Sequence, residues 1–156
     1  MGEDNNKLSN LIFIQACGLQ WPANNRYCMA IPNSALVADD ENHIRSYVRI
    51  ILNHLGVETI YEAKTGLEAV ESFEANKPDV VFLDINMPGM TGLEALPKIM
   101  EIDPDAVVLM LTGHASRHLV EGSAKAGALH YIRKDTPQKE ITSMLSDLFD
   151  ELFGED

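Results

Sequence analysis

Basic residues are scarce in this sequence, which has 12 lysines and arginines against 24 aspartates and glutamates. The formal net charge is -12 at pH 7, and the basic residues form no stripe or cluster. Because nucleic-acid binding depends on clustered Lys and Arg that contact phosphates, we expect no nucleic-acid partner. The excess of carboxylates instead favours binding of cations or of a basic partner surface.

Long hydrophobic runs are also missing, since no apolar stretch approaches the roughly 20 residues that a membrane-spanning helix needs. Glu3 and Asp4 lie where a secretory signal would carry positive charge. Hydrophobic residues make up 46% of the 156 residues and charged residues 23%, the usual balance of one compact globular domain. We therefore expect a cytoplasmic protein that makes no contact with a membrane.

Cysteine is nearly absent as well, because Cys17 and Cys28 are the only two and both lie in the first 30 residues. Two thiolates do not complete a tetrahedral zinc site, and no histidine-rich segment lies nearby. Reduced thiols are favoured over a disulfide in a reducing compartment. Neither a zinc module nor a disulfide-stapled fold is expected.

From Ser34 onward, short apolar runs alternate with longer stretches of helical periodicity. This alternation is typical of repeated βα units around a parallel sheet, so the sequence predicts an α/β fold. Thr136 is the expected N-cap of the last helix, with Pro137 as its first helical residue and Phe153 near its end. The other predicted helices span 42–55, 66–75, 92–102 and 116–126, and the predicted strands span 35–38, 59–63, 80–83, 106–111 and 129–133.

Residues 1–33 do not continue this pattern. The stretch 11–14 could form an added strand that packs on the sheet or pairs with another subunit. The competing interpretation is that the segment before Met29 contributes little to the fold, because a compact domain of this type could begin at Met29. We therefore expect an N-terminal extension over 1–33 and a single domain over 34–153.

Functional side chains follow four of the predicted strands. Asp39 and Asp40 come directly after the first strand, Asp84 after the third, Thr112 after the fourth and Lys134 after the fifth. Ligands of parallel α/β sheets bind beyond the carboxyl ends of the strands, where these side chains would converge. If the first and third strands are neighbours, the three carboxylates share one pocket.

Three carboxylates in one pocket raise one another's pKa unless a positive charge intervenes. A hard divalent cation with oxygen ligands is the simplest remedy, and Mg²⁺ suits the site because it binds through few carboxylates and keeps several waters. A carboxylate can also act as the nucleophile toward a phosphoryl group. The cation and Lys134 would then neutralise the equatorial oxygens, and the Thr112 hydroxyl would donate a hydrogen bond to one of them.

Each of these residues also has an ordinary explanation. A lone aspartate at a strand end is commonly a helix cap or a turn residue. The pair Asp39 and Asp40 could complement a helix dipole, and a lone Lys134 would be a solvated charge. Their joint placement at successive strand ends favours the chemical interpretation.

At these residues the sequence resembles the receiver domains of two-component response regulators, especially the stand-alone chemotaxis type. The resemblance runs from about Ser34 to Phe153, and it implies a flavodoxin-like, doubly wound, five-stranded parallel sheet in the order 2-1-3-4-5 with helices on both faces. The most specific stretch is VVFLDINMPGMTG at 80–92, and three shorter motifs follow the family order: LVADD at 36–40, LMLTG at 109–113 and YIRK at 131–134.

The resemblance implies that Asp84 is the phosphoacceptor for a histidine kinase or a histidine phosphotransfer protein. It implies that Asp39 and Asp40 hold Mg²⁺ directly or through water, together with Asp84, and that Asn86 ligates the ion through its backbone carbonyl. Such a protein is not an enzyme in the usual sense, because it catalyses only its own phosphorylation and dephosphorylation.

Thr112 and Tyr131 fall where the family has its switch pair. By resemblance, the threonine hydroxyl moves toward the phosphoryl group and the aromatic ring fills the space that it leaves. This would bias a two-state equilibrium on the face formed by the fourth helix, fifth strand and fifth helix, where a downstream protein target binds. Core packing is the alternative for Tyr131, and a phosphate sink or scaffold without a switch is the alternative for the whole chain.

Two positions depart from the family pattern. The lysine is usually followed by a proline in a cis peptide, but here Asp135 follows Lys134. A cis bond without proline costs about 2.5–4 kcal/mol, so either the strain persists or the loop is reshaped. His114, two residues after Thr112, would border the pocket and influence how long the phosphoryl group survives, unless it is an exposed loop histidine.

A phosphohydrolase of the haloacid-dehalogenase kind is the rival from another class, because it also combines an aspartate nucleophile, Mg²⁺, a hydroxyl and a lysine. That chemistry requires a second acid two residues after the nucleophile as general acid and base. Asn86 occupies this position and cannot transfer a proton. The sequence therefore favours the phosphoacceptor over the hydrolase.

Overall fold

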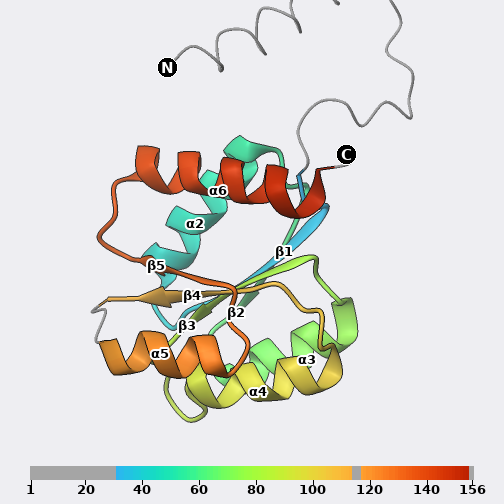
Figure 1. The fold of residues 1–156 in the computed structure, drawn as a ribbon, viewed down its shortest axis with the longest axis vertical. Helices are drawn as coiled ribbons and strands as arrows, with labels where there is room; N and C mark the ends of the chain where they lie inside the picture. The colour runs from blue at the N-terminus through green and yellow to red at the C-terminus, as the bar shows by residue number, and fades with distance from the viewer. Residues whose placement is uncertain (1–30, 114–116, 155–156) are drawn as a thin grey trace, which may run out of the picture.

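The computed structural model describes residues 31–113 and 117–154 as a parallel sheet between two layers of helices (Figure 1). The sheet has five strands in the order β2-β1-β3-β4-β5, and every neighbouring pair is parallel. The strands are β1 (Ser34–Ala38), β2 (Thr59–Ala63), β3 (Val80–Asp84), β4 (Val108–Thr112) and β5 (His130–Arg133). The helices are α2 (Asn42–Leu55), α3 (Gly66–Asn76), α4 (Gly92–Ile102), α5 (Arg117–Lys125) and α6 (Gln138–Phe153).

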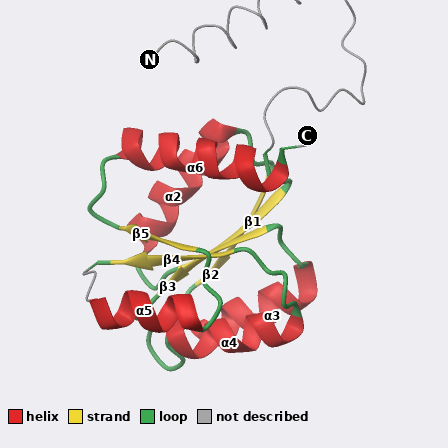
Figure 2. Ribbon diagram, in the orientation of Figure 1, coloured by secondary structure: helices red, strands yellow, loops and turns green. Residues whose placement is uncertain are grey.

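The helices divide between the two faces of the sheet, with α2 and α6 on one side and α3, α4 and α5 on the other (Figure 2). Successive side chains of each strand point to opposite faces of the sheet, so each strand contributes apolar side chains to both core layers. Val37 and Phe82 pack with α2 and α6, whereas Leu36 and Leu83 pack with α3 and α4. Because both faces are covered, the central strands read as continuous apolar runs.

The register aligns the carboxyl ends of the strands at one edge of the sheet. Ala38 pairs with Leu83, so the residues that follow them, Asp39 and Asp84, come next in two adjacent strands. On the other side of β4, Thr112 pairs with Arg133, directly before Lys134. The predicted functional residues are therefore brought to the same edge.

The fold class, the number of strands and the order 2-1-3-4-5 are confirmed. The predicted element bounds differ from the observed ones by two residues or fewer. The predicted start of the last helix was wrong: Pro137 is its N-cap, without a side-chain hydrogen bond, and Gln138 is its first residue. The cysteines, the stretch 11–14 and His114 lie outside the described residues.

Within the described ranges, none of the helices combines the length and the apolar content needed to cross a bilayer.

Candidate functional site

Asp39, directly after β1, is fully buried. Its backbone N–H donates to the carbonyl of Ala63 at 3.0 Å, which continues the β1–β2 ladder by one residue. Its Oδ1 accepts from the N–H of Glu41 at 2.9 Å, and its own carbonyl accepts from Arg45 Nη1 at 2.8 Å. Both the carboxylate and the backbone of Asp39 are therefore fixed before any ligand arrives.

Asp84, the last residue of β3, is 2% exposed. Its Oδ1 accepts from the N–H of Asn86 at 3.3 Å, so the turn that follows the strand holds one carboxylate oxygen. Gly92, the first residue of α4, packs directly on the backbone carbonyl of Asp84, where a Cβ would overlap the oxygen. A side chain at position 92 is therefore incompatible with this path of the β3–α4 loop.

Lys134, after β5, extends its ammonium group between the acids. Its Nζ lies 2.7 Å from Asp39 Oδ2, 3.1 Å from Asp84 Oδ2 and 3.4 Å from Glu41 Oε1. We call Asp39, Glu41, Asp84 and Lys134 the acid–lysine cluster. It joins residues from the ends of three strands and from the loop before α2.

Ionisation of Asp84 is opposed by its surroundings. Burial first, and then the charge of Asp39, raise the pKa of Asp84 from 3.8 to about 6, although Lys134 and the Asn86 N–H act in the opposite direction. Burial lowers the pKa of Lys134, but its contacts with Asp39 and Asp84 outweigh this effect and raise the pKa above its usual value. At neutral pH, Asp84 is therefore a mostly ionised carboxylate beside a charged ammonium.

Two buried carboxylate oxygens of the cluster share a single ammonium. Lys134 Nζ lies within ion-pair distance of both Asp39 Oδ2 and Asp84 Oδ2, and neither oxygen has another hydrogen-bond partner among the described residues. One ammonium thus serves two buried oxygens of like charge. Because a buried carboxylate oxygen is costly without a partner, this pair fits a second cation such as Mg²⁺.

The described residues also contain a group of acids whose ligand atoms lie within 4.8 Å of one another, and it consists of Asp39, Asp40 and Glu41. Asp39 and Asp40 were predicted as metal ligands, whereas Glu41 was not. Asp84 lies outside this group but shares Lys134 with Asp39. Asn86, the remaining predicted ligand, is exposed and adjoins the cluster through its N–H bond to Asp84.

The predicted switch pair occupies two neighbouring strands. Thr112, at the end of β4, is 3% exposed, and its carbonyl accepts from the N–H of Lys134 at 2.8 Å. Tyr131 lies on β5 opposite Met110, two residues before the strand end that carries the site. The ring of Tyr131 is stacked at an angle against His130, and the residue is 39% exposed, which argues against simple core packing.

The Lys134–Asp135 peptide is trans, as are the other peptides of the described residues, so the loop differs from the cis-proline form. Asp135 instead forms a two-pronged ion pair with Arg133, with 3.0 Å from Nε to Oδ1 and 2.6 Å from Nη2 to Oδ2. The N–H of Thr136 donates to the carbonyl of Arg133 at 3.1 Å and closes a turn. Of the two alternatives for this position, the reshaped loop is the one observed.

Arg45 was missed by the sequence analysis. Its side chain is 6% exposed, donates from Nη1 to the Asp39 carbonyl and from Nη2 to Asn42 Oδ1 at 3.0 Å, and lies 3.4 Å through Nε from Glu62. A signal was present in the sequence, because Arg45 shares the buried face of α2 with Val48 and Leu52. A charged residue at a core spacing needs a buried partner.

A parallel sheet of this order, with acids and a lysine gathered at its carboxyl edge, defines a CheY-like protein of the flavodoxin-like fold. The family model for the response regulator receiver domain matches residues 35–146. The chain belongs to this family and is a receiver domain of a two-component response regulator.

Individual relatives agree with this assignment. The chain is 41% identical over 99 residues to the chemotaxis protein CheY of Listeria monocytogenes, covering 64% of this chain and 83% of that protein. It is 42% identical over 116 residues to a protein-glutamate methylesterase/protein-glutamine glutaminase of Archaeoglobus fulgidus, covering 72% of this chain and 33% of that enzyme. Among solved structures, it is similar to the CheX–CheY–BeF3–Mg complex of Borrelia burgdorferi, with a TM-score of 0.71, 30% identity, and 76% and 90% of the two chains covered.

Proposed function

We propose that Asp84 is the phosphoacceptor and that Lys134, Thr112 and a Mg²⁺ ion assist the transfer. The observation that carries the proposal is the contact between Lys134 Nζ and Asp84 Oδ2, 3.1 Å apart in a buried setting. A buried carboxylate with a raised pKa is a better nucleophile than a solvated one once it is ionised, because less water must be removed from it.

The reaction proposed is a single phosphoryl transfer. An oxygen of Asp84 attacks the phosphorus of a phosphohistidine, an acyl–phosphate bond forms, and the P–N bond breaks with its electron pair leaving on the imidazole. Lys134 moves from Asp39 and Glu41 toward an oxygen of the phosphoryl group. Thr112, at the adjacent strand end, donates its hydroxyl to another oxygen.

Asp39, Asp40, Asp84 and the carbonyl of Asn86 are the residues proposed to hold Mg²⁺. The two buried oxygens that share the ammonium of Lys134, Asp39 Oδ2 and Asp84 Oδ2, support this choice. When bound, the ion supplies positive charge for the oxygens of the transferring group. The chain's own residues orient the carboxylates and exclude water from one side of the pocket.

We further infer that the donor is a histidine kinase or a histidine phosphotransfer protein and that phosphorylation changes affinity for a protein target. Tyr131 and Leu129, which are 39% and 49% exposed on and beside β5, leave apolar surface near the proposed switch. Catalysis limited to the chain's own phosphorylation and dephosphorylation fits the absence of a proton-transferring group at Asn86, two residues beyond the nucleophile.

Labelling with a small phosphodonor such as phosphoramidate, in the presence of Mg²⁺, tests the assignment. Wild-type protein should gain one phosphoryl group by intact mass, and Asp84→Asn should gain none. Asp105→Asn, which changes an exposed acid in the turn before β4, is the matched control and should be labelled normally. Persistent labelling of Asp84→Asn would refute the choice of residue.

A phosphate sink or scaffold without a switch remains the second candidate, because a phosphoacceptor site alone does not require an output. The two differ in one measurement, which is the affinity of the downstream target for the protein with and without BeF3⁻ and Mg²⁺. A change in affinity supports the switch, and equal affinities support the sink.

A further inference from the structure

Tyr47 reaches across from α2 to the loop that carries Lys134. Its hydroxyl donates a hydrogen bond to the backbone carbonyl of Thr136 at 3.2 Å, in a partly buried setting. The two residues are 89 positions apart in the sequence, so the bond ties two distant segments together. Thr136 is the second residue after Lys134.

The loop has few other anchors. The N–H of Lys134 donates to the carbonyl of Thr112 at 2.8 Å and holds the beginning of the loop. The Arg133–Asp135 ion pair, which takes the place of the usual proline constraint, is exposed, with side chains 55% and 60% accessible. An exposed pair contributes little to holding a loop, because water competes for both charges. The Tyr47 bond is therefore the anchor at the far side of the loop.

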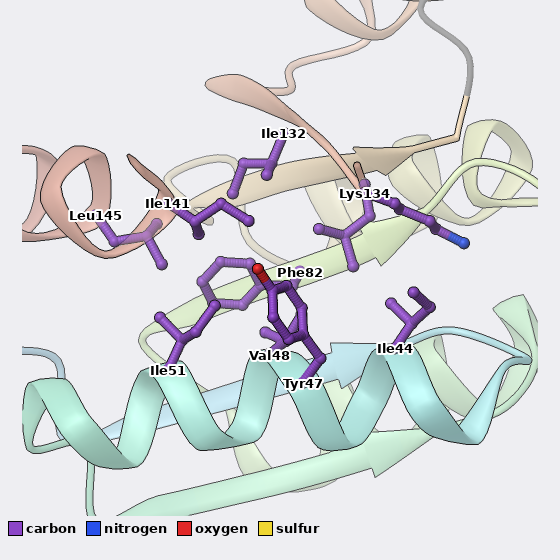
Figure 3. Close-up of a pocket in the computed structure, with 10 residues that line it drawn as sticks. Ile44, Tyr47, Val48, Ile51, Phe82, Ile132, Lys134, Ile141 and Leu145 are labelled. Carbon is purple, nitrogen blue, oxygen red and sulfur yellow. The ribbon is translucent and has the colours of Figure 1, made fainter. Parts of the chain in front are cut away.

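The Lys134 side chain runs along the core from the loop to the acids. Its stem lines a small apolar cavity of about 10 Å³ between α2, the sheet and α6, together with Tyr47 and Ile132 (Figure 3). Figure 3 shows the nitrogen of Lys134 pointing away from this cavity. A cavity of this size holds about one water molecule and leaves the stem little room to move. Asp39 and Asp84 hold the ammonium, so its reach is set by these ion pairs and by where the backbone of Lys134 is held.

We propose that Tyr47 is a positioning residue for phosphoryl transfer, which holds the β5–α6 loop so that Lys134 reaches Asp84. The inference rests on the proposed function of Asp84 and Lys134. Lys134 must leave Asp39 and Glu41 and contact a phosphoryl oxygen during transfer. A loop fixed at Thr136 confines this movement to the side chain, whereas a loose loop spreads the ammonium over many positions.

Tyr47→Phe removes the hydroxyl and keeps the ring. The rate of labelling by phosphoramidate at saturating Mg²⁺ should fall roughly three- to tenfold, which is the effect expected from the loss of one hydrogen bond. Mg²⁺ affinity should stay within about twofold of wild type, because Asp39 and Asp40 are not held by Tyr47. Tyr61→Phe is the matched control: Tyr61 is partly buried against the opposite face of the sheet and should label at the wild-type rate.

A double-mutant cycle with Lys134→Ala separates positioning from general structural support. If Tyr47 acts through Lys134, the double variant labels as slowly as Lys134→Ala alone, because the loop no longer carries the ammonium. Effects that multiply in the double variant would overturn the inference, as would an unchanged rate in Tyr47→Phe. Rates are compared well below the unfolding midpoint of each variant, so lost stability does not imitate the effect.

The outcomes also distinguish this inference from the proposed function. If Asp84→Asn is not labelled and Lys134→Ala is slow, but Tyr47→Phe labels normally, only the role of Tyr47 is wrong. If Asp84→Asn is still labelled, the phosphoacceptor assignment fails, and the role of Tyr47 fails with it.

Discussion

Asp84 carries its charge at a position where burial works against it. Burial and the charge of Asp39 raise its pKa from 3.8 to about 6, so the folded protein binds a proton more tightly than the unfolded chain does. Between the two pKa values, from about pH 4 to pH 6, the free energy of unfolding therefore falls as the pH rises. The site keeps an unfavourable charge whose neutralisation by a ligand is correspondingly favourable.

Asp84→Asn should consequently stabilise the metal-free protein at pH 7. The pKa difference, from 3.8 to about 6, converts to a gain of roughly 1–3 kcal/mol, because the amide keeps the shape and removes the charge. The measurement is urea unfolding in EDTA as a function of pH. The wild-type free energy of unfolding should fall relative to that of the variant between about pH 4 and pH 6. Parallel curves over this window would contradict the raised pKa.

Gly92 is a second position near the site where adding one carbon atom should change both stability and labelling. Gly92→Ala places a Cβ on the carbonyl oxygen of Asp84, so the loop between β3 and α4 must shift. We expect a loss of roughly 1–3 kcal/mol in unfolding free energy and slower labelling by phosphoramidate. Gly122→Ala in α5 has open space around the added methyl and is the control. Equal behaviour of the two variants would show that the loop adapts.

Some residues of the site could be predicted from the sequence and others could not. Asp39, Asp84 and Lys134 follow apolar strands directly, and strand ends of a parallel sheet share one edge, so their meeting could be predicted. Glu41 was missed because its approach to Lys134 depends on the path of the loop before α2, which periodicity does not report.

Among the elements, α2 supports the site from two sides. Arg45 holds the carbonyl of Asp39, and Tyr47, two residues later, holds the loop after β5. Arg45 also contacts Glu62 on the edge strand β2. Burial of its guanidinium makes these contacts matter more than similar ones at the surface.

Arg45→Met should therefore lower both stability and cation affinity. We expect a loss of about 2–4 kcal/mol in unfolding free energy, because the carbonyl of Asp39 and the side chain of Glu62 lose a buried partner. Mg²⁺ affinity, measured by calorimetry, should fall roughly three- to tenfold as the Asp39 backbone loosens. Arg49→Met removes an exposed arginine from the same Glu62 and should change either quantity little.

The helices and strands themselves were largely predictable, because both layers of the core impose clear periodicities. Asn42–Leu55 and Gly92–Ile102 were predicted with the observed bounds. The start of α6 was not predicted correctly, because the sequence favours Thr136 as its N-cap and the structure has Pro137 there. The carbonyl of Thr136 accepts a hydrogen bond from Tyr47, and a contact between residues so far apart in the sequence cannot be predicted from a local pattern.

At the scale of the molecule, the described residues from Ile31 onward supply all five strands and both layers of the core. Ile31 itself packs against the core beside α2, and the N–H groups of Asn33 and Ser34 donate to Asp79 Oδ2 at 2.8 and 3.1 Å. These contacts anchor the segment 31–34 to the rest of the domain.

A chain that begins at Met29 should therefore fold and be labelled like the full chain. We expect its thermal midpoint to lie within a few degrees of the full-length value, because the described residues from 31 onward include all five strands and both core clusters. Circular dichroism and phosphoramidate labelling measure the two properties. A chain that begins at Ala35, which lacks Ile31 and the bonds to Asp79, is the comparison and should be clearly less stable. Loss of folding in the longer chain would mean that residues 1–28 contribute to the core.

Asp79 accepts the hydrogen bonds that hold the backbone at the amino end of β1. This end of the sheet lies opposite the carboxyl ends of the strands, where Lys134 is found, and the last turn of α6 lies on the same side as the amino end of β1 (Figure 1). A linker attached directly before Ile31 or directly after Gly154 would therefore leave the domain on the side away from the acid–lysine cluster. A domain immobilised through such a linker would keep its proposed phosphoacceptor side open to the solution.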